Sequence, residues 1–150
     1  ITVRTEDVSV CDDGLNSIRK RKSSDLLNRE ELVNTTENAI LLSIHQNFFT
    51  QSQYSGTQVF YSANREESAA LAQKIQEKVR TNLQPDNTRE IKKSGDSIYL
   101  LYNAKQIAVM VECGFLSNKA ELEKLKAPVY NAQLSYCIVT GLIDFLKKDV

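Results

Sequence analysis

Residues 107–113 read Ile-Ala-Val-Met-Val-Glu-Cys, a run that is apolar at every position except Glu112. A strand with so little alternation between apolar and polar side chains is typical of a sheet that is covered on both faces. Such sheets are largely parallel, because the helices that connect parallel strands also cover the faces of the sheet. The run therefore predicts an α/β fold.

Strands and helices alternate along the rest of the chain. Apolar or alternating runs predict strands at residues 1–5, 41–45 and 57–61, and helical periodicity predicts helices from Asn28 onward and at residues 66–83, 117–125 and 128–147. Residues 6–27 are polar and lack a sustained apolar face, so we expect a surface loop there. Residues 97–102 are too short to distinguish strand from helix, and Gly114 is expected to end the strand at 107–113. The pattern predicts one three-layer α/β domain, with a largely parallel twisted sheet flanked by helices.

Composition excludes several classes of function. The chain has 150 residues, 41% of them hydrophobic and 25% charged, which is ordinary for a single globular domain. Its 19 basic and 19 acidic residues cancel, so no overall field attracts nucleic acid or an anionic membrane. No apolar run is long enough to span a bilayer. One histidine, and three cysteines without C-x-x-C spacing, exclude a zinc site built from several histidines or from cysteines of this chain alone.

Two side chains with catalytic potential stand at the ends of predicted strands. His45 ends one strand just before a polar loop, and Glu112 lies near the end of the apolar run. Ligands of open α/β sheets bind beyond the carboxyl ends of the strands, where these two groups would suit metal ligation and general-base chemistry. A lone histidine after a strand is commonly structural, whereas a buried carboxylate is costly unless it is paired, protonated or in use. Glu112 is thus the stronger signal.

A rival hypothesis makes Cys113 a nucleophile with His45 as its base. Neighbouring residues of a strand point to opposite faces, so Glu112 and Cys113 are not expected to line the same site. Apolar surroundings also raise the pKa of a thiol and so reduce its reactivity. We therefore favour Glu112 over Cys113.

The segments around both residues resemble those of zinc-dependent N-acetylmuramoyl-L-alanine amidases. Residues 43–47, Ser-Ile-His-Gln-Asn, resemble the family segment S-I-H-x-N, and residues 111–118, Val-Glu-Cys-Gly-Phe-Leu-Ser-Asn, resemble V-E-x-G-F-L-S-N. Residues 3–7 are similar to the T-R-x-x-D strand with Arg and Thr exchanged, and residues 56–61 to the G-x-E-x-Y strand with Gln58 in place of glutamate. The likeness covers residues 1–147 and is strongest to the germination-specific spore-cortex amidases of spore formers.

This resemblance implies hydrolysis of the amide between N-acetylmuramic acid and the L-alanine of peptidoglycan. A zinc-activated water would attack that amide, with His45 as a zinc ligand and Glu112 as the general base. Asn47 and Arg89 are the implied substrate-binding residues, with surface or loop-pinning roles as the alternative. The polar loop at residues 46–55 is expected to influence specificity. An extracytoplasmic location, at the cell wall or spore cortex, is implied as well.

The family's first zinc histidine and its zinc glutamate precede the T-R strand, so the resemblance places both before Ile1. Residues 1–150 are therefore expected to be an N-terminally incomplete amidase catalytic domain that lacks the family's first strand and helix. With His45 alone, this chain is expected not to hold zinc. Peptidoglycan is the expected substrate, and a separate N-terminal fragment or a protein partner is expected to cover the apolar surface left on the sheet. A non-catalytic, amidase-like binding module is the alternative function.

Overall fold

A four-stranded sheet forms the centre of the computed structural model, which describes residues 1–3 and 5–147. The strand order is β1-β4-β2-β3, with β1 at Ile40–Asn47, β2 at Gln58–Tyr61, β3 at Lys92–Lys93 and β4 at Ile107–Phe115. β1 pairs with β4, and β2 with β3, in parallel, whereas β2 and β4 are antiparallel. The predicted largely parallel α/β sheet is confirmed. β2 runs antiparallel to β4 because a loop without a helix joins β1 to β2, and a parallel strand would need a longer crossover connection.

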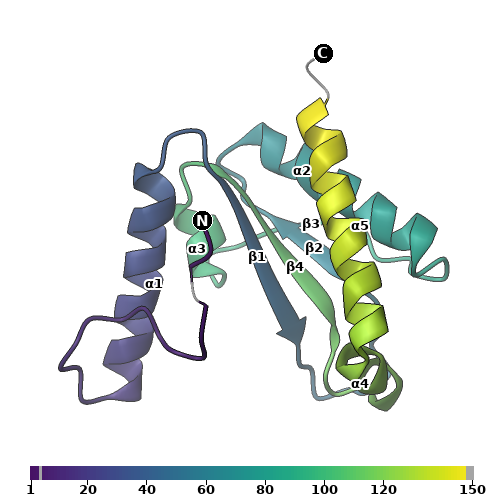
Figure 1. Ribbon diagram of the computed structural model, residues 1–150, viewed down its shortest axis with the longest axis horizontal. Helices are drawn as coiled ribbons and strands as arrows, with labels where there is room; N and C mark the ends of the chain where they lie inside the picture. Colours follow the sequence, from purple (N-terminus) through teal and green to yellow (C-terminus); the bar gives the residue numbers. More distant parts are fainter. Residues whose placement is uncertain (4, 148–150) are drawn as a thin grey trace.

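Helices cover both faces of this sheet (Figure 1). They are α1 at Ile18–Thr35, α2 at Glu66–Asn82, α3 at Tyr99–Asn103, α4 at Lys119–Lys126 and α5 at Pro128–Leu146. One hydrophobic cluster joins α2, α4 and α5 to one face of the sheet, and a smaller cluster joins α3 to the other. α1 packs on α3, to one side of β1 (Figure 1). The three predicted layers are therefore present.

Side chains of β4 alternate strictly between the two hydrophobic clusters. Val109, Val111 and Cys113 belong to the larger cluster, whereas Ala108 and Met110 belong to the smaller one. All five are buried, as the apolar run predicts for a strand covered on both faces. By the same alternation, Glu112 lies on the α3 face.

Two predictions for the N-terminal part are wrong. Residues 1–3 and Thr5 form no strand, and Arg4 of the T-R-like segment lies outside the described residues. The helix expected from Asn28 begins at Ile18, inside the segment expected to be a loop. Ser17 caps it, its hydroxyl accepting a hydrogen bond from the Lys20 amide at 3.2 Å. Periodicity missed this helix because α1 packs mainly on α3 and buries no apolar stripe, Ser24 being its one residue classed as buried.

The strand expected to end at Gly114 continues to Phe115. Glu121 of α4 explains the glycine, because a Cβ at position 114 would lie 3.2 Å from Glu121 Oε2. That same oxygen accepts a hydrogen bond from the Phe115 amide at 2.8 Å. Asn118 is the N-cap of α4, with Oδ1 accepting from the amides of Ala120 and Glu121.

α5 carries two apolar stripes, one facing inward and one facing outward. The inner stripe contains Leu134, Cys137, Ile138 and Gly141, all buried. The outer stripe contains side chains that are 40% to 71% exposed, namely Val129, Tyr136, Val139, Ile143 and Leu146. Val139 of this stripe lines a cleft together with Ile44 of β1, which is an edge strand of the described sheet, and Ile44 is 54% exposed. An exposed apolar surface of this kind is typical of a docking surface.

Gly141 allows α5 to approach α2 closely. A Cβ at this position would lie 2.7 Å from the Ile75 Cα, a backbone atom that cannot rotate away. Gly141→Ala is expected to lower the free energy of unfolding by about 2 kcal/mol, because the two helices must separate. This loss outweighs the gain of about 1 kcal/mol in helix propensity. Urea unfolding followed by circular dichroism measures the change.

The control variant is Gly95→Ala, where an added Cβ meets no atom within 4 Å. Its free energy of unfolding is expected to stay within about 0.5 kcal/mol of the parent value. Equal stability of the two variants would contradict the close-packing interpretation of Gly141.

Candidate active site

Three polar residues form a row across the sheet, on the face covered by α3. His45 of β1 and Gln58 of β2 are both register partners of Glu112 in β4. Neighbouring strands lie about 4.8 Å apart, so the Cα atoms of His45 and Gln58 are about 10 Å apart with Glu112 between them. The structure therefore brings together the two residues singled out for catalysis.

The Glu112 carboxylate has an unusual environment. Its Oε2 atom is buried and makes no hydrogen bond with the described residues. Burial raises the pKa of this carboxyl above its ordinary value. A buried oxygen without a partner costs about 1–3 kcal/mol, so the fold keeps Glu112 at a cost to its stability. A carboxyl with a raised pKa is suited to accept and release a proton near neutral pH.

His45 is exposed at the end of β1. Its Nε2 atom lies 2.9 Å from the Ser43 hydroxyl. Partial loss of solvent, and next the positive charge of Arg29, lower the pKa of the imidazole. The neutral ring that these effects favour is the form that binds a metal ion.

A cleft of about 1000 Å³ separates α1 from β1 beside His45. Arg29 and Asp25 line its α1 side and form an ion pair, with Nε 2.6 Å from Oδ2. Hydrogen bonding from Arg29 lowers the pKa of Asp25 to about 2. Asp25 also accepts hydrogen bonds from Ser9 Oγ and the Val10 amide, which tie the N-terminal segment to α1. This cleft gives a ligand access to His45.

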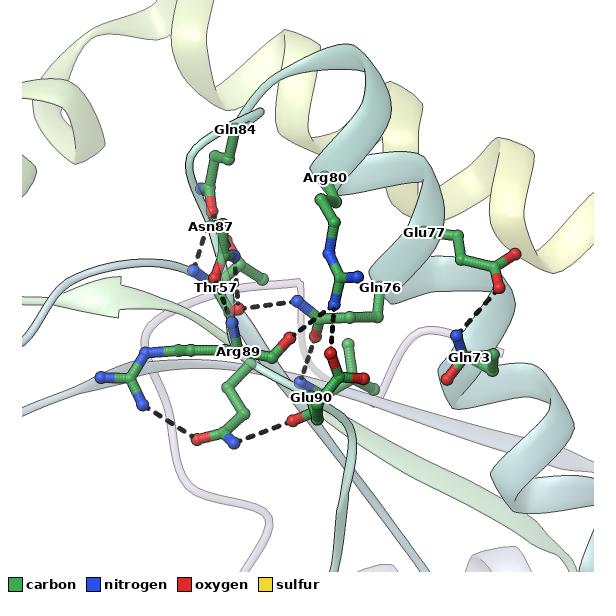
Figure 2. A network of polar contacts seen from close by, with 11 residues as sticks. Thr57, Gln73, Gln76, Glu77, Arg80, Gln84, Asn87, Arg89 and Glu90 are labelled. Carbon is green, nitrogen blue, oxygen red and sulfur yellow. Dashed lines mark hydrogen bonds and ion pairs between the residues drawn. The ribbon is translucent and has the colours of Figure 1, made fainter.

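Arg89, predicted from the sequence to bind substrate, continues the row beyond Gln58. Its Nη1 donates to Gln58 Oε1 at 3.2 Å, and its Nε donates to the Ser55 carbonyl at 2.6 Å. The guanidinium carbon lies 4.6 Å from the centre of the Phe115 ring. Figure 2 shows Arg89 within the polar network that joins the 84–90 segment to β2 and α2. Four polar groups therefore line one side of the sheet.

Asn47 lies past the regular part of this row. The register of β1 and β4 shifts between His45 and Asn47, whose Cα partner is Phe115. The Asn47 carbonyl accepts a hydrogen bond from the Leu116 amide at 2.8 Å. This contact holds the end of β1, and a substrate-binding role for the Asn47 side chain stays a prediction.

Cys113 lies on the opposite face of β4, within the larger hydrophobic cluster. Burial, and next the charge of Glu112, raise the pKa of its thiol to about 11. Few thiolates form at neutral pH under these conditions. The geometry and the pKa both disfavour the thiol-nucleophile hypothesis.

Sequence reasoning missed two residues that build the site. Gln58 was noted only as a departure from a motif, yet it links Arg89 to the row. Glu121 is buried and accepts hydrogen bonds from the amides of Gly56 and Phe115, both at 2.8 Å. Its position three residues after Asn118 has the spacing of a capping box, which would have indicated a structural role.

His45 has a ring nitrogen of the kind that can bind a metal ion, and Glu112, its register partner, has an oxygen without a hydrogen-bond partner among the described residues. Within residues 1–3 and 5–147, no group of three or more His, Cys, Asp and Glu side chains could hold a metal ion. A catalytic zinc needs three protein ligands, so these residues do not form a zinc site by themselves.

Comparison with known proteins agrees with this geometry. The chain belongs to the N-acetylmuramoyl-L-alanine amidase family, whose profile matches residues 1–144. It is 32% identical over 148 residues to the germination-specific N-acetylmuramoyl-L-alanine amidase of Bacillus subtilis (strain 168), an alignment covering 99% of this chain and 62% of the relative. The amidase LytC of the same organism is 27% identical over 135 residues, 87% of this chain and 27% of LytC. The chain thus spans less than two thirds of these relatives.

Solved structures show the same fold. The CwlD amidase from Clostridioides difficile, in complex with the GerS lipoprotein, superposes with a TM-score of 0.92 at 34% identity, covering 97% of this chain and 74% of that one. The amidase AmiC2 of Nostoc punctiforme shares the fold with a TM-score of 0.72 at 21% identity, covering 81% and 66% of the two chains. The resemblance found in the sequence is therefore confirmed at the level of family and fold.

The environment of Glu112 predicts a pH-dependent effect on stability. Since the folded chain holds this pKa above the ordinary 4.5, ionisation of Glu112 destabilises the fold as pH rises through that range. Glu112→Gln cannot ionise. The free energy of unfolding of this variant, relative to the parent, is therefore expected to increase between about pH 4 and pH 7. Urea unfolding at several pH values measures it.

Glu123→Gln, on the surface of α4, is the control for loss of one carboxylate. Only Glu112→Gln is expected to gain free energy of unfolding, relative to the parent, as the pH rises. An identical pH profile for both variants would show that burial of Glu112 has no thermodynamic effect.

Proposed function

We propose that this chain forms part of an enzyme that hydrolyses the amide between N-acetylmuramic acid and L-alanine in peptidoglycan. One observation carries the proposal: Glu112, a half-buried carboxylate with one buried and unpaired oxygen, stands in register with His45 at the strand ends of an amidase-family fold. Membership of the family supports the substrate and the reaction. The chain spans 62% of the germination-specific amidase from Bacillus subtilis, so the activity is proposed for the enzyme of which this chain forms part.

Glu112 is the general base of the proposed reaction. Its unpaired Oε2 takes a proton from the attacking water, and the same oxygen gives that proton to the leaving amine of L-alanine. Burial raises the pKa of the Glu112 carboxyl, so this carboxylate binds a proton more readily than an ordinary glutamate, as a general base must. The glycan and the peptide would lie on either side of the row formed by His45, Glu112 and Gln58, with Asn47 and Arg89 binding the substrate.

His45 is the proposed zinc ligand of this chain. A bound zinc ion polarises an amide carbonyl and lowers the pKa of water, which is the chemistry that such a site needs. Its remaining ligands would have to come from outside the described residues. We propose that they belong to a segment that completes the catalytic domain, of which residues 1–150 form the larger part.

The proposed segment would cover β1 and the outer stripe of α5, where the described chain exposes apolar side chains. The relative from Clostridioides difficile was solved in complex with a lipoprotein, so a protein partner is also part of the proposal. No described helix is both long enough and apolar enough to cross a bilayer. Action on the cell wall or spore cortex, outside the cytoplasm, follows from the proposed substrate.

A non-catalytic binding module is the second candidate. The observation in its favour is that the described residues lack a set of three metal donors. The unpaired Glu112 oxygen argues against it, since a site without chemistry gains nothing from this cost to stability.

Activity and metal content of the full-length protein test the proposal. Glu112→Gln is expected to lower kcat for muropeptide cleavage by about 10²- to 10⁴-fold and to leave bound zinc unchanged. His45→Ala is expected to lose zinc, because it removes a ligand. Elemental analysis and chromatography of the cleavage products measure the two effects.

Cys113→Ala is the matched control, because the thiol lies on the opposite face of β4. It is expected to retain both zinc and activity. A protein that binds cell-wall material without zinc and without cleavage would establish the binding module instead.

The outer stripe of α5 gives a separate prediction. Val139→Asp places a charge on an exposed position, so the free energy of unfolding of the isolated chain is expected to change by less than about 0.5 kcal/mol. Association with the completing segment is expected to weaken, because the charge loses water at the interface. Native mass spectrometry measures the association, and an unaffected complex would show that the stripe is not the contact surface.

A further inference from the structure

Arg89 is held in place at both its backbone and its side chain. Its amide donates to Asn87 Oδ1 at 3.0 Å, and its carbonyl accepts from Arg80 Nη2 at 3.0 Å (Figure 2). Asn87 is buried and itself donates to the Thr57 carbonyl at 2.8 Å. The loop that carries Arg89 is thus fixed to the first residues of β2. A side chain fixed in this way loses little entropy when it binds a ligand.

The positive charge of Arg89 is not neutralised by the described part of the chain. Arg29, Arg65 and Arg80 each form an ion pair with a carboxylate. Arg89 forms none with a described residue, and its hydrogen-bond acceptors are two neutral oxygens, from Ser55 and Gln58. A guanidinium has five N–H donors, so most of its donors stay available.

The surroundings of Arg89 favour a planar anion as its ligand. The guanidinium carbon lies over the buried Phe115 ring and 5.8 Å from the centre of the Tyr54 ring. Arg89 also lines an open cleft of about 680 Å³, whose lining includes Tyr54 and Lys124 but not the other members of the row, so a ligand can reach Arg89 from that side. Aromatic rings beside a guanidinium exclude water and strengthen its charge-assisted bonds to carboxylates, which it binds in bidentate fashion.

The location of Arg89 relates it to the cleaved bond. Arg89 follows Gln58 in the row that contains His45 and Glu112, so its guanidinium group lies on the order of 10 Å from Glu112. One extended peptide residue spans about 3.4 Å along the backbone. A carboxylate one or two residues from an amide at Glu112 would therefore reach Arg89.

We propose that Arg89 is the receptor for a free carboxylate on the peptide arm of the substrate, on the residue that follows L-alanine. This inference rests on the proposed function, which places the cleaved amide at Glu112. It adds that the site prefers a peptide whose second residue has a free carboxylate over a peptide in which that carboxylate is amidated. Gln58 is the positioning residue, because its neutral side-chain oxygen accepts a hydrogen bond from Arg89 Nη1 and leaves the positive charge of Arg89 unpaired.

Equilibrium binding to the 150-residue chain tests this proposal without any cleavage. The probes are two muramyl dipeptides whose D-glutamyl γ-carboxyl is blocked as a methylamide, one with a free α-carboxylate and one with an α-carboxamide, and calorimetry gives each Kd. The parent chain is expected to bind the acid about 10-fold more tightly than the amide, a central value for one charge-assisted pair. Arg89→Gln is expected to bind both with the same weak affinity.

Two further variants separate charge from structure. Arg89→Lys keeps the positive charge but loses the planar guanidinium that binds a carboxylate through two hydrogen bonds. It is expected to keep part of the preference for the acid. Gln58→Glu keeps Arg89 but supplies an internal carboxylate, and is expected to abolish the preference. The control is Arg65→Gln, which removes a positive charge at the start of α2 and is expected to keep the full preference.

Retention of the preference in Arg89→Gln would overturn the proposal, and so would the absence of any preference, or of binding, in the parent chain. The cleavage assay on Glu112→Gln judges the amidase function separately. If the enzyme cleaves its substrate but binds the acid and the amide with equal affinity, only the proposed role of Arg89 is refuted, and the amidase function stands.

Discussion

β4 is the strand on which the rest of the structure depends. It pairs with β1 on one side and with β2 on the other, and it contributes side chains to both hydrophobic clusters. Because side chains alternate along a strand, burial of Val111 and Cys113 on one face fixes Glu112 on the other. The register with β1 and β2 then places His45 and Gln58 beside it. The site is therefore a consequence of the same packing that stabilises the sheet.

The sequence predicted the central elements well because periodic burial leaves a pattern. The apolar run of β4 indicated a strand covered on both faces, and α2 and α5 were visible through their inner stripes. His45 and Glu112 could be identified because both interrupt or end apolar strands. The alternation of strand side chains also separated Glu112 from Cys113 correctly.

Other features left no pattern to read. α1 was hidden because it packs mainly on another helix, α3, and β3, with two exposed lysines, has no apolar signal. The extension of β4 through Gly114 depends on Glu121, a contact between residues that sequence spacing does not reveal. The environment of Arg89 depends on Gln58, Ser55 and Phe115, which three separate segments bring together.

The antiparallel direction of β2 has a consequence for how such a site can change in evolution. One loop, residues 48–57, leaves β1 just after His45 and enters β2 just before Gln58, so both of its ends are fixed at the row of polar groups. Loop closure depends only weakly on length, and the hydrophobic clusters lie within other elements. Insertions, deletions and substitutions in this loop can therefore reshape the entrance to the site, while the row of polar groups and the core that supports it stay in place.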